Sequence, residues 1–395
     1  MNRKKIFKRT LLSSAVLLAS FQVFADDTAP EVSSDAGMIE SLTGFSINNT
    51  SFMQDTGFEV GMWASAGITG NTNGGTTNAP ILFNDRVNEV LFNELNFYIE
   101  RAVNSGGSHW DIGGRFDFMY GTDARFTQAS GWDDDWTDNH YYDIAIPQLY
   151  LEVYAPLGNG LTAKLGHFYT TIGYEVVTAP DNFFYSHAYT MLYAEPFTHT
   201  GVMFSYDIND NFSVNGGAVM GWDNMTENPG AWSFLGGGSW TSNDQASSVT
   251  VQLISGDTSD TEASNRTMYS IVATHDFTDN FHYIFQHDFG TQIRADSVGQ
   301  QDGNWFGINQ YVMYDINDKL SFGLRAEWFN DKGGANRVGP IGANYLAASF
   351  GVNYSPLSWL KLRPEVRYDW ADEKAFNNNR GNDQVEFAMD MIITF

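Results

Sequence analysis

The chain contains no cysteine among its 395 residues, so disulfide bonds, zinc–thiolate centres, thiol catalysis and covalent haem attachment are excluded. Basic residues are scarce as well: 21 Lys and Arg stand against 47 Asp and Glu, and the formal net charge is −26. This balance excludes a nucleic-acid-binding protein, because such proteins attract phosphates with basic patches.

Long apolar runs are also missing from most of the chain. No stretch after residue 25 reaches the ~18 consecutive apolar residues that a membrane helix needs. Charged residues make up only 17% of the chain, whereas aromatic residues reach 15% and glycine occurs 38 times. Few charges with many aromatic and glycine residues are typical of a β-barrel whose outer wall faces lipid.

The N-terminus has the organisation of a secretory signal peptide. A basic start is followed by a short apolar stretch and by the small residues Val23 and Ala25 ahead of a cleavage site. We therefore expect residues 1–25 to be removed during export. Residues 26–56 are polar and are expected to form a periplasmic N-terminal segment, and residues 57–395 are expected to form the barrel.

Short runs with a period of two recur along residues 57–395. Apolar residues occupy every second position of the closing run VEFAMDMIITF, a pattern that predicts a strand with one apolar and one polar face. In the run 360–368 the polar face consists of four ionisable side chains, which cannot face lipid. These residues are Lys361, Arg363, Glu365 and Arg367.

The connections between these runs are alternately short and long. The short ones use turn-forming residues, as in the similar stretches SYDINDNFS and MYDINDKLS. This alternation of short and long connections indicates that all tight turns lie at one end of the fold, as in barrels with short periplasmic turns and longer external loops. We predict an all-β fold, a transmembrane antiparallel up-and-down β-barrel of about 16 strands with an inward-folded loop. Its last strand, ending at Phe395, pairs with the first strand and leaves no free edge.

The inward-folded loop is predicted from the connection 170–201, which is long but rich in aromatic residues. Exposed to water, such a segment would promote aggregation, so we expect it to enter the lumen and narrow the pore. Two further strands or an external lid are the alternatives. The residues expected to meet passing solutes at the constriction are Tyr174, Glu175, Asn182, Tyr185, His187 and Tyr189.

The lumen is expected to be polar and mixed in sign, and a barrel of this size can hold a water channel. The main inward-facing charges are predicted to be Arg115, Asp117, Lys164, Arg325, Glu327, Lys361, Arg363, Glu365 and Arg367. Further inward candidates are Glu94, Asp111, Glu152, Glu386 and Asp390.

A family resemblance is densest around the aromatic connection. The stretches KLGHFYTTIGYE and NFFYSHAYTMLYAEPFTHTG, followed by SYDINDNFSVNGGAVMGWDN, resemble the putative β-barrel porin-2 (OmpL-like) family. The likeness extends from about Gly57 to Phe395. It implies an outer-membrane barrel of the porin type, without a substrate or a proven site. The closing strand also resembles the C-terminal signal that the barrel-assembly machinery reads in outer-membrane proteins.

The sequence therefore predicts a porin of the Gram-negative outer membrane, with a water-filled channel for passive diffusion of small hydrophilic solutes or ions. Its expected partners are membrane lipid and lipopolysaccharide, the barrel-assembly machinery and the solutes, and assembly into a homo-oligomer stays open. The motifs GxSxG, HExxH and the P-loop are absent, and we expect no catalytic residue, cofactor or metal. The alternatives are a barrel-anchored surface binding or adhesion protein with a closed lumen, an outer-membrane enzyme, and a sheath around an electron-transfer protein.

Overall fold

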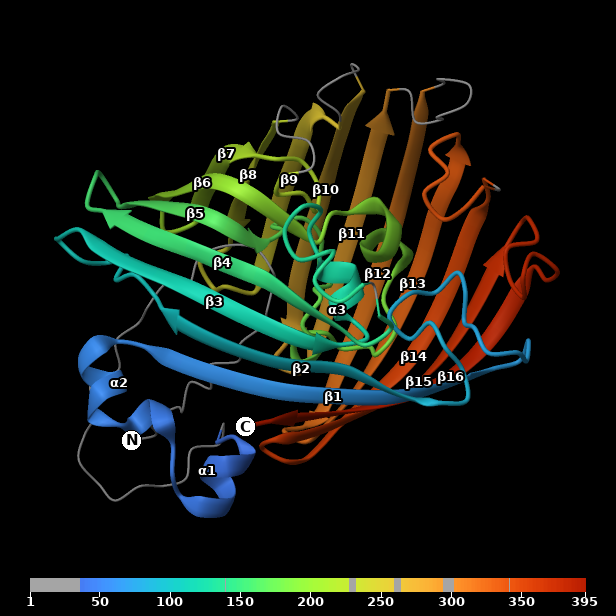
Figure 1. Ribbon diagram of the computed structural model, residues 1–395, viewed down its shortest axis with the longest axis horizontal. Helices are drawn as coiled ribbons and strands as arrows, with labels where there is room; N and C mark the ends of the chain where they lie inside the picture. Colours follow the sequence, from blue (N-terminus) through green and yellow to red (C-terminus); the bar gives the residue numbers. More distant parts are fainter. Residues whose placement is uncertain (1–35, 139, 227–231, 259–263, 294–301, 341) are drawn as a thin grey trace.

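The computed structural model describes residues 36–138, 140–226, 232–258, 264–293, 302–340 and 342–395. In these residues sixteen strands form one closed barrel, and each strand is antiparallel to both of its neighbours (Figure 1). The fold class predicted from the alternating runs is confirmed. The expected signal peptide, residues 1–25, lies outside the described residues.

The barrel strands follow one another around the wall in chain order. They are β1 (Glu59–Asn71), β2 (Val90–Arg101), β3 (Asp111–Gly121), β4 (Asp143–Ala155), β5 (Leu161–Tyr169), β6 (Thr198–Asn209), β7 (Phe212–Val219), β8 (Ser233–Thr241), β9 (Ser247–Asp257), β10 (Asn265–Thr278), β11 (Phe281–Gln292), β12 (Gly303–Asn317), β13 (Leu320–Gly333), β14 (Asn344–Leu357), β15 (Leu360–Ala371) and β16 (Asp383–Thr394). The short helical elements are α1 (Met38–Thr43), η1 (Ile47–Asn49), α2 (Ser51–Thr56), α3 (Ala124–Thr127), η2 (Ala179–Asp181) and η3 (Thr190–Ala194).

The barrel closes between its first and last strands. β1 pairs with β16 over nine residues, from Trp63 opposite Thr394 to Asn71 opposite Glu386. The backbone N–H of Phe395 extends this contact by donating to the carbonyl of Met62 at 2.9 Å. The closure predicted from the C-terminal alternation is therefore confirmed, and no strand edge is left unpaired.

The connections alternate in length as expected. The even-numbered strands from β4 to β14 are followed by short turns of two to five residues, and the shortest are 210–211, 279–280, 318–319 and 358–359; the connection after β2 is longer, residues 102–110. Most odd-numbered strands are followed by a longer connection, and the longest are 72–89, 122–142 and 170–197. Because neighbouring strands run in opposite directions, the short turns gather at one end of the barrel and the longer connections at the other.

The period of two places apolar side chains outside and polar side chains inside. On β16, Phe387 and Met389 are 59% and 45% exposed on the outer wall, whereas Glu386 and Asp390 point inward and are at most 1% exposed. An apolar outer wall around a polar interior is the arrangement that a bilayer requires, since hydrocarbon cannot solvate charged groups.

The helices α1 and α2 lie outside the barrel, close to the C-terminus (Figure 1). A hydrogen bond of 2.8 Å from Ser358 Oγ, in the turn between β14 and β15, to the carbonyl of Ala36 ties the start of this segment to the end with the short turns. No helix among the described residues is long and apolar enough to cross a membrane.

Candidate functional site

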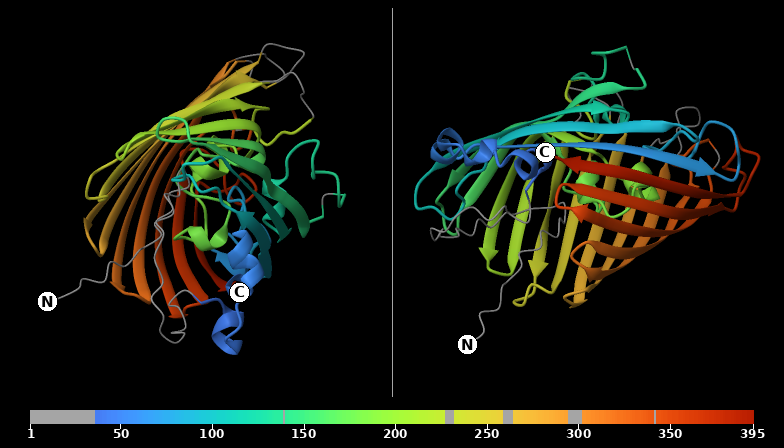
Figure 2. Two further views of the ribbon diagram at one scale, coloured as in Figure 1. Left: turned by 90° about the vertical axis from the view of Figure 1, so that its left-hand side faces the viewer. Right: turned by 90° about the horizontal axis from the view of Figure 1, so that it is seen from below.

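The connection between β5 and β6, residues 170–197, folds into the barrel and carries η2 and η3 (Figure 2). We call it the lumen loop. Its apolar and aromatic side chains are buried: Phe184, Tyr189 and Met191 are between 0% and 3% exposed. Inside the lumen these apolar side chains are shielded from water, whereas exposed outside the barrel they would promote aggregation. β6 begins at Thr198 rather than near residue 200, because the ladder with β5 continues to the pair Tyr169 and Thr198.

Carboxylates of the opposite wall hold the backbone of the lumen loop. Glu365 on β15 accepts hydrogen bonds from the N–H groups of Tyr185 and Ser186, both at 3.0 Å. Glu327 on β13 accepts from the N–H of Tyr189 at 2.8 Å. Hydrogen bonds to an ionised acceptor are stronger than neutral ones, so these contacts fix the path of the loop across the barrel.

A further wall carboxylate that binds the backbone of the lumen loop lies on β2. Glu94 accepts a hydrogen bond from the N–H of Ala179 in η2 at 3.1 Å and from the indole N–H of Trp63 at 2.5 Å. Glu94 is 0% exposed. The loop is therefore anchored on both sides of the barrel closure, on β2 on one side and on β13 and β15 on the other.

Arginines of the wall hold the carbonyl groups of the loop. Arg363 on β15 donates to the carbonyls of Ala179, Asn182 and Phe184 at 2.7 to 3.0 Å, while Asp390 on β16 balances its charge at 2.6 Å. These bonds satisfy backbone acceptors that have no strand partner. A loop without regular structure is tolerated at membrane depth only where such partners exist.

Two other basic residues of β15 also donate hydrogen bonds to carbonyl groups of the lumen loop. Arg367 on β15 donates to the carbonyl of His187 at 2.8 Å and pairs with Asp369 at 2.9 Å. Lys361 at the start of the same strand donates to the carbonyl of Pro180 at 2.9 Å. The alternating ionisable face of β15 points inward and serves as the main docking surface of the lumen loop.

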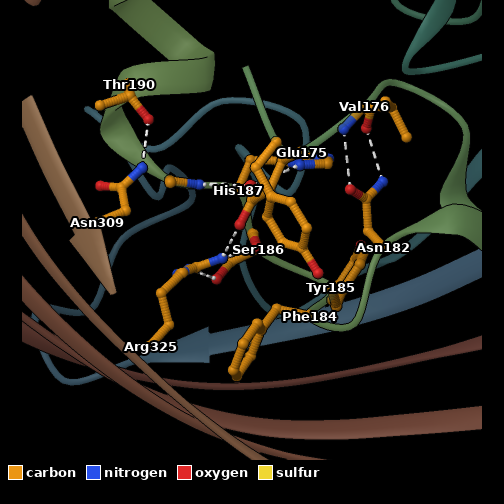
Figure 3. A network of polar contacts seen from close by, with 12 residues as sticks. Glu175, Val176, Asn182, Phe184, Tyr185, Ser186, His187, Thr190, Asn309 and Arg325 are labelled. Carbon is orange, nitrogen blue, oxygen red and sulfur yellow. Dashed lines mark hydrogen bonds and ion pairs between the residues drawn. The ribbon is translucent and has the colours of Figure 1, made fainter. Parts of the chain in front are cut away.

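Glu175 lies at the centre of the network that joins the loop to β13 (Figure 3). Its carboxylate lies 2.8 Å from the guanidinium of Arg325, 2.8 Å from the N–H of Ala188 and 3.2 Å from Nδ1 of His187. Burial alone would raise the pKa of Glu175, but the charge of Arg325 and the hydrogen bonds outweigh it and lower that pKa to about 2. Glu175 is therefore ionised at neutral pH.

Arg325 completes the connection. It also donates to the carbonyl of Ser186 at 2.6 Å and pairs with Glu327 on its own strand at 2.7 Å (Figure 3). Its side chain is fully buried. Because a buried charge without its partner costs several kcal/mol, the members of this network hold one another in place.

Glycines in the wall make room for the aromatic side chains of the loop. A Cβ atom at Gly323 on β13 would lie 2.3 Å from the ring of Phe183, and one at Gly67 on β1 would lie 2.4 Å from the ring of Tyr185. No other residue type allows this approach without displacing a ring. The loop and the wall are therefore matched in shape as well as in charge.

The six residues predicted at the constriction all belong to the lumen loop, but most face the wall. Five are less than a tenth exposed: Glu175, Asn182, Tyr185, His187 and Tyr189. Asn182 bonds within the loop, donating to the carbonyl of Val176 at 2.6 Å (Figure 3). Tyr174 is partly exposed, and its ring lies 4.9 Å from that of Tyr311 on β12. Contact of these residues with solutes stays a prediction.

The predicted lumen charges divide into two groups. Those on β13 and β15 are buried beneath the loop, apart from the partly exposed Lys361. Those on β3 and β5 lie on the other side: Arg115 pairs with Asp117 at 2.6 Å and with Glu100 at 2.8 Å, and the ammonium of Lys164 lies 4.2 Å from the ring centre of Tyr150. Arg115 and Lys164 keep partial exposure.

Sequence reasoning missed the neutral part of the inner wall. Near the short turns, inward positions of β8, β9 and β10 carry hydroxyl groups that pair across strands, with Ser239 3.0 Å from Thr250 and Ser248 2.8 Å from Thr274. These side chains are partly exposed although they point into the barrel. We call this surface the hydroxyl wall. Further along the same strands Leu235, Ile254 and Met268 are buried in the hydrophobic cluster that includes side chains of the lumen loop. The available sequence signal was Ser or Thr at two successive inward positions, Ser239 and Thr241 on β8 and Ser248 and Thr250 on β9.

The described residues contain no group of three or more His, Asp or Glu side chains that could hold a metal ion. The lumen offers hydrogen bonds and charges of both signs. Groups of this kind can orient polar solutes.

Comparison with known proteins gives a family and a fold. The profile of the family described as putative beta-barrel porin-2, OmpL-like, matches residues 57–395. No curated protein sequence matches the chain.

Solved structures resemble the barrel over most of its length. OprB of Pseudomonas putida aligns with a TM-score of 0.58 at 10% identity, covering 87% of this chain and 96% of its own. DcaP of Acinetobacter baumannii, an outer-membrane channel, aligns with 0.56 at 11% identity, covering 86% and 97%. An anion-selective porin from Comamonas acidovorans aligns with 0.57 at 9% identity, covering 86% and 99%. At these identities the likeness establishes the fold.

Proposed function

Because the chain belongs to the putative beta-barrel porin-2, OmpL-like, family, we propose that it forms an outer-membrane channel through which small hydrophilic solutes or ions diffuse passively. The observation that carries this proposal is the asymmetry of the lumen. The lumen loop is hydrogen-bonded to β2, β13 and β15, whereas the hydroxyl wall near the short turns keeps partly exposed polar side chains inside the barrel.

The proposed path runs between the loop and the hydroxyl wall. On one side it meets Tyr174 and the free surface of the loop, and on the other it meets neutral residues such as Thr250. Arg115 and Lys164 border it on β3 and β5 and supply positive charge near the end with the short turns. The six predicted constriction residues set the width of this path by holding the loop in place, and Tyr174 contacts solutes directly.

The membrane context follows from the family and the apolar outer wall. The barrel contacts outer-membrane lipid and passes solutes, and membership of a porin family supports a non-enzymatic role. We further propose that residues 1–25 direct export and that the strand ending at Phe395 is read by the barrel-assembly machinery. Contact with lipopolysaccharide, a periplasmic place for residues 26–56 and homo-oligomer formation belong to the same proposal.

The experiment that tests the channel is a planar-bilayer recording of the mature chain, supported by a pair of adjacent variants. Thr250→Trp adds a bulky ring to the hydroxyl wall, and Val251→Trp adds the same ring to the outer wall, where Val251 is 42% exposed. We expect ohmic conductance steps in KCl that only Thr250→Trp reduces. Absence of any conductance would instead favour a barrel that anchors binding loops around a closed lumen.

A further inference from the structure

Four side chains meet at the end of the barrel with the longer connections, beside the lumen loop. Arg266 lies at the start of β10 and Trp305 at the start of β12 (Figure 1), while Trp222 and Arg337 belong to the connections 220–232 and 334–343.

Both guanidinium groups lie against the same indole ring. The guanidinium carbon of Arg266 is 4.7 Å and that of Arg337 is 5.2 Å from the ring centre of Trp222. Arg337 also lies 5.1 Å from the ring centre of Trp305, and the two rings are packed edge to face with centres 6.2 Å apart. Two positive charges are thus brought to one small area, which is unfavourable unless negative charge joins them.

Neither guanidinium has an ion-pair partner among the described residues. The Nε–H of Arg266 donates to the amide oxygen of Gln292 at 2.8 Å, and that of Arg337 donates to the carbonyl of Tyr193 in η3 at 2.7 Å. Both acceptors are neutral. Elsewhere in the lumen Arg115, Arg325, Arg363 and Arg367 all pair with carboxylates.

The two nearest carboxylates bind backbone groups instead. Asp223 accepts from the N–H groups of Phe197 and Thr198 at 2.9 and 2.7 Å, where the lumen loop enters β6. Asp331 accepts the N–H groups of Arg337 and Val338 at 2.8 and 2.9 Å. Their charges lie near the arginines, yet their oxygens face amide hydrogens.

A second observation is independent of charge. Within the described part of the chain the indole N–H groups of Trp222 and Trp305 have no hydrogen-bond partner, and Trp305 is 0% exposed. A buried donor left unpaired costs about 1 to 3 kcal/mol. The cluster therefore offers guanidinium and indole donors, and no acceptor among these four side chains competes for them.

We propose that a binding site for a small dissolved oxyanion, a carboxylate or phosphate group, is formed by Arg266, Arg337, Trp222 and Trp305. The site lies at the end of the barrel with the longer connections, beside the lumen loop. An oxyanion supplies the negative charge and the acceptor atoms that this cluster lacks. The binding itself stands apart from transport. Its role in collecting anionic solutes ahead of the constriction rests on the proposed channel function.

The test is calorimetric titration of inorganic phosphate into the detergent-purified mature chain, free of lipopolysaccharide, at low ionic strength. We expect saturable binding that Arg337→Gln weakens about tenfold, equivalent to ~1.4 kcal/mol, and that Arg266→Gln with Arg337→Gln abolishes. Trp222→Phe keeps the ring but removes the N–H, and should weaken binding by roughly threefold. Choline chloride, a cationic probe, should release no heat.

The matched control is Arg380→Gln, which removes an exposed arginine from the connection 372–382 and should leave phosphate affinity unchanged. Retained heat-modifiable migration on gels verifies that each variant is folded. Absence of phosphate binding to the unaltered chain, or equal affinity in the double arginine variant, would overturn the site. Conductance without phosphate binding refutes the site alone, and phosphate binding without conductance refutes the channel alone.

Discussion

Arg325 on β13 and Glu175 in the lumen loop form an ion pair of 2.8 Å in which both side chains are at most 5% exposed. The two residues are 150 positions apart in the chain, so this contact exists only when the loop lies across the closed barrel. Their pairing ties the position of the loop to the charge pattern of the wall.

Removing the positive member of this pair should release the loop. Arg325→Ala leaves the carboxylate of Glu175 buried without its arginine counter-charge, which costs about 3 to 5 kcal/mol, while Glu327 keeps its ion pair with Arg367 at 3.2 Å. We expect larger and noisier conductance while the barrel stays heat-modifiable. The control Arg86→Gln breaks an exposed pair with Glu89 worth at most about 1 kcal/mol and should change neither property. Unaltered conductance in Arg325→Ala would show that the pair does not hold the loop.

Adding a side-chain carbon at a wall glycine that contacts the lumen loop should also displace the loop. A Cβ at Gly67 would meet the buried ring of Tyr185, whose hydroxyl donates to Asn93 at 3.0 Å, so Gly67→Ala should destabilise docking by about 1 to 3 kcal/mol. Protease cleavage within the loop measures the displacement. Gly70→Ala on the same strand meets only Asn88, at 3.8 Å, and should leave cleavage at its original level.

Acidification should loosen the loop only at very low pH. The folded pKa of Glu175, about 2, is depressed below its usual 4.5. Its charge therefore stabilises docking fully above about pH 4.5, and this contribution is lost as pH falls towards 2. We expect channel noise to be constant from pH 8 to about pH 5 and to rise below about pH 4. Glu175→Gln has no such charge to lose, so its noise should be higher at neutral pH and should change less with acid. An identical acid response in both proteins would assign the transition to other groups.

The hydroxyl wall should set the solute size limit. Thr250→Trp narrows the proposed path and should lower conductance by roughly twofold, because the ring occupies part of the water-filled section. Liposome swelling with sugars of increasing size measures the shift in cut-off. Val251→Trp points to lipid and serves as the control. Equal effects of the two variants would exclude a path along this wall.

The barrel itself could be predicted from sequence because its signals are local. Alternation fixes which face of each strand meets lipid, a slip of one residue would turn every charge on β15 outward, and the turn residues mark the strand ends. The inward course of the lumen loop also followed from composition, since aromatic residues such as Phe184 and Tyr189 need cover.

The docking partners could not be predicted in the same way. Glu365 meets Tyr185 and Ser186 only through the closed barrel, and no local pattern encodes a contact across 180 positions. The convergence of Arg266 and Arg337 on Trp222 has the same origin, because the barrel brings together one strand and two connections that are far apart in sequence.

The late position of β13 to β16 in the chain has a consequence for biogenesis. Partners that cover Phe183 and Tyr189, such as Gly323 and Asp369, are supplied by residues 320–394, which a polypeptide truncated before β13 lacks. In a truncated chain the aromatic side chains of the lumen loop would therefore be exposed and β1 would lack its partner strand. Such a state is susceptible to proteolysis. Once the last strand is complete, the aromatic side chains are covered and β1 is paired. Resistance to proteolysis is therefore expected of complete chains and not of fragments.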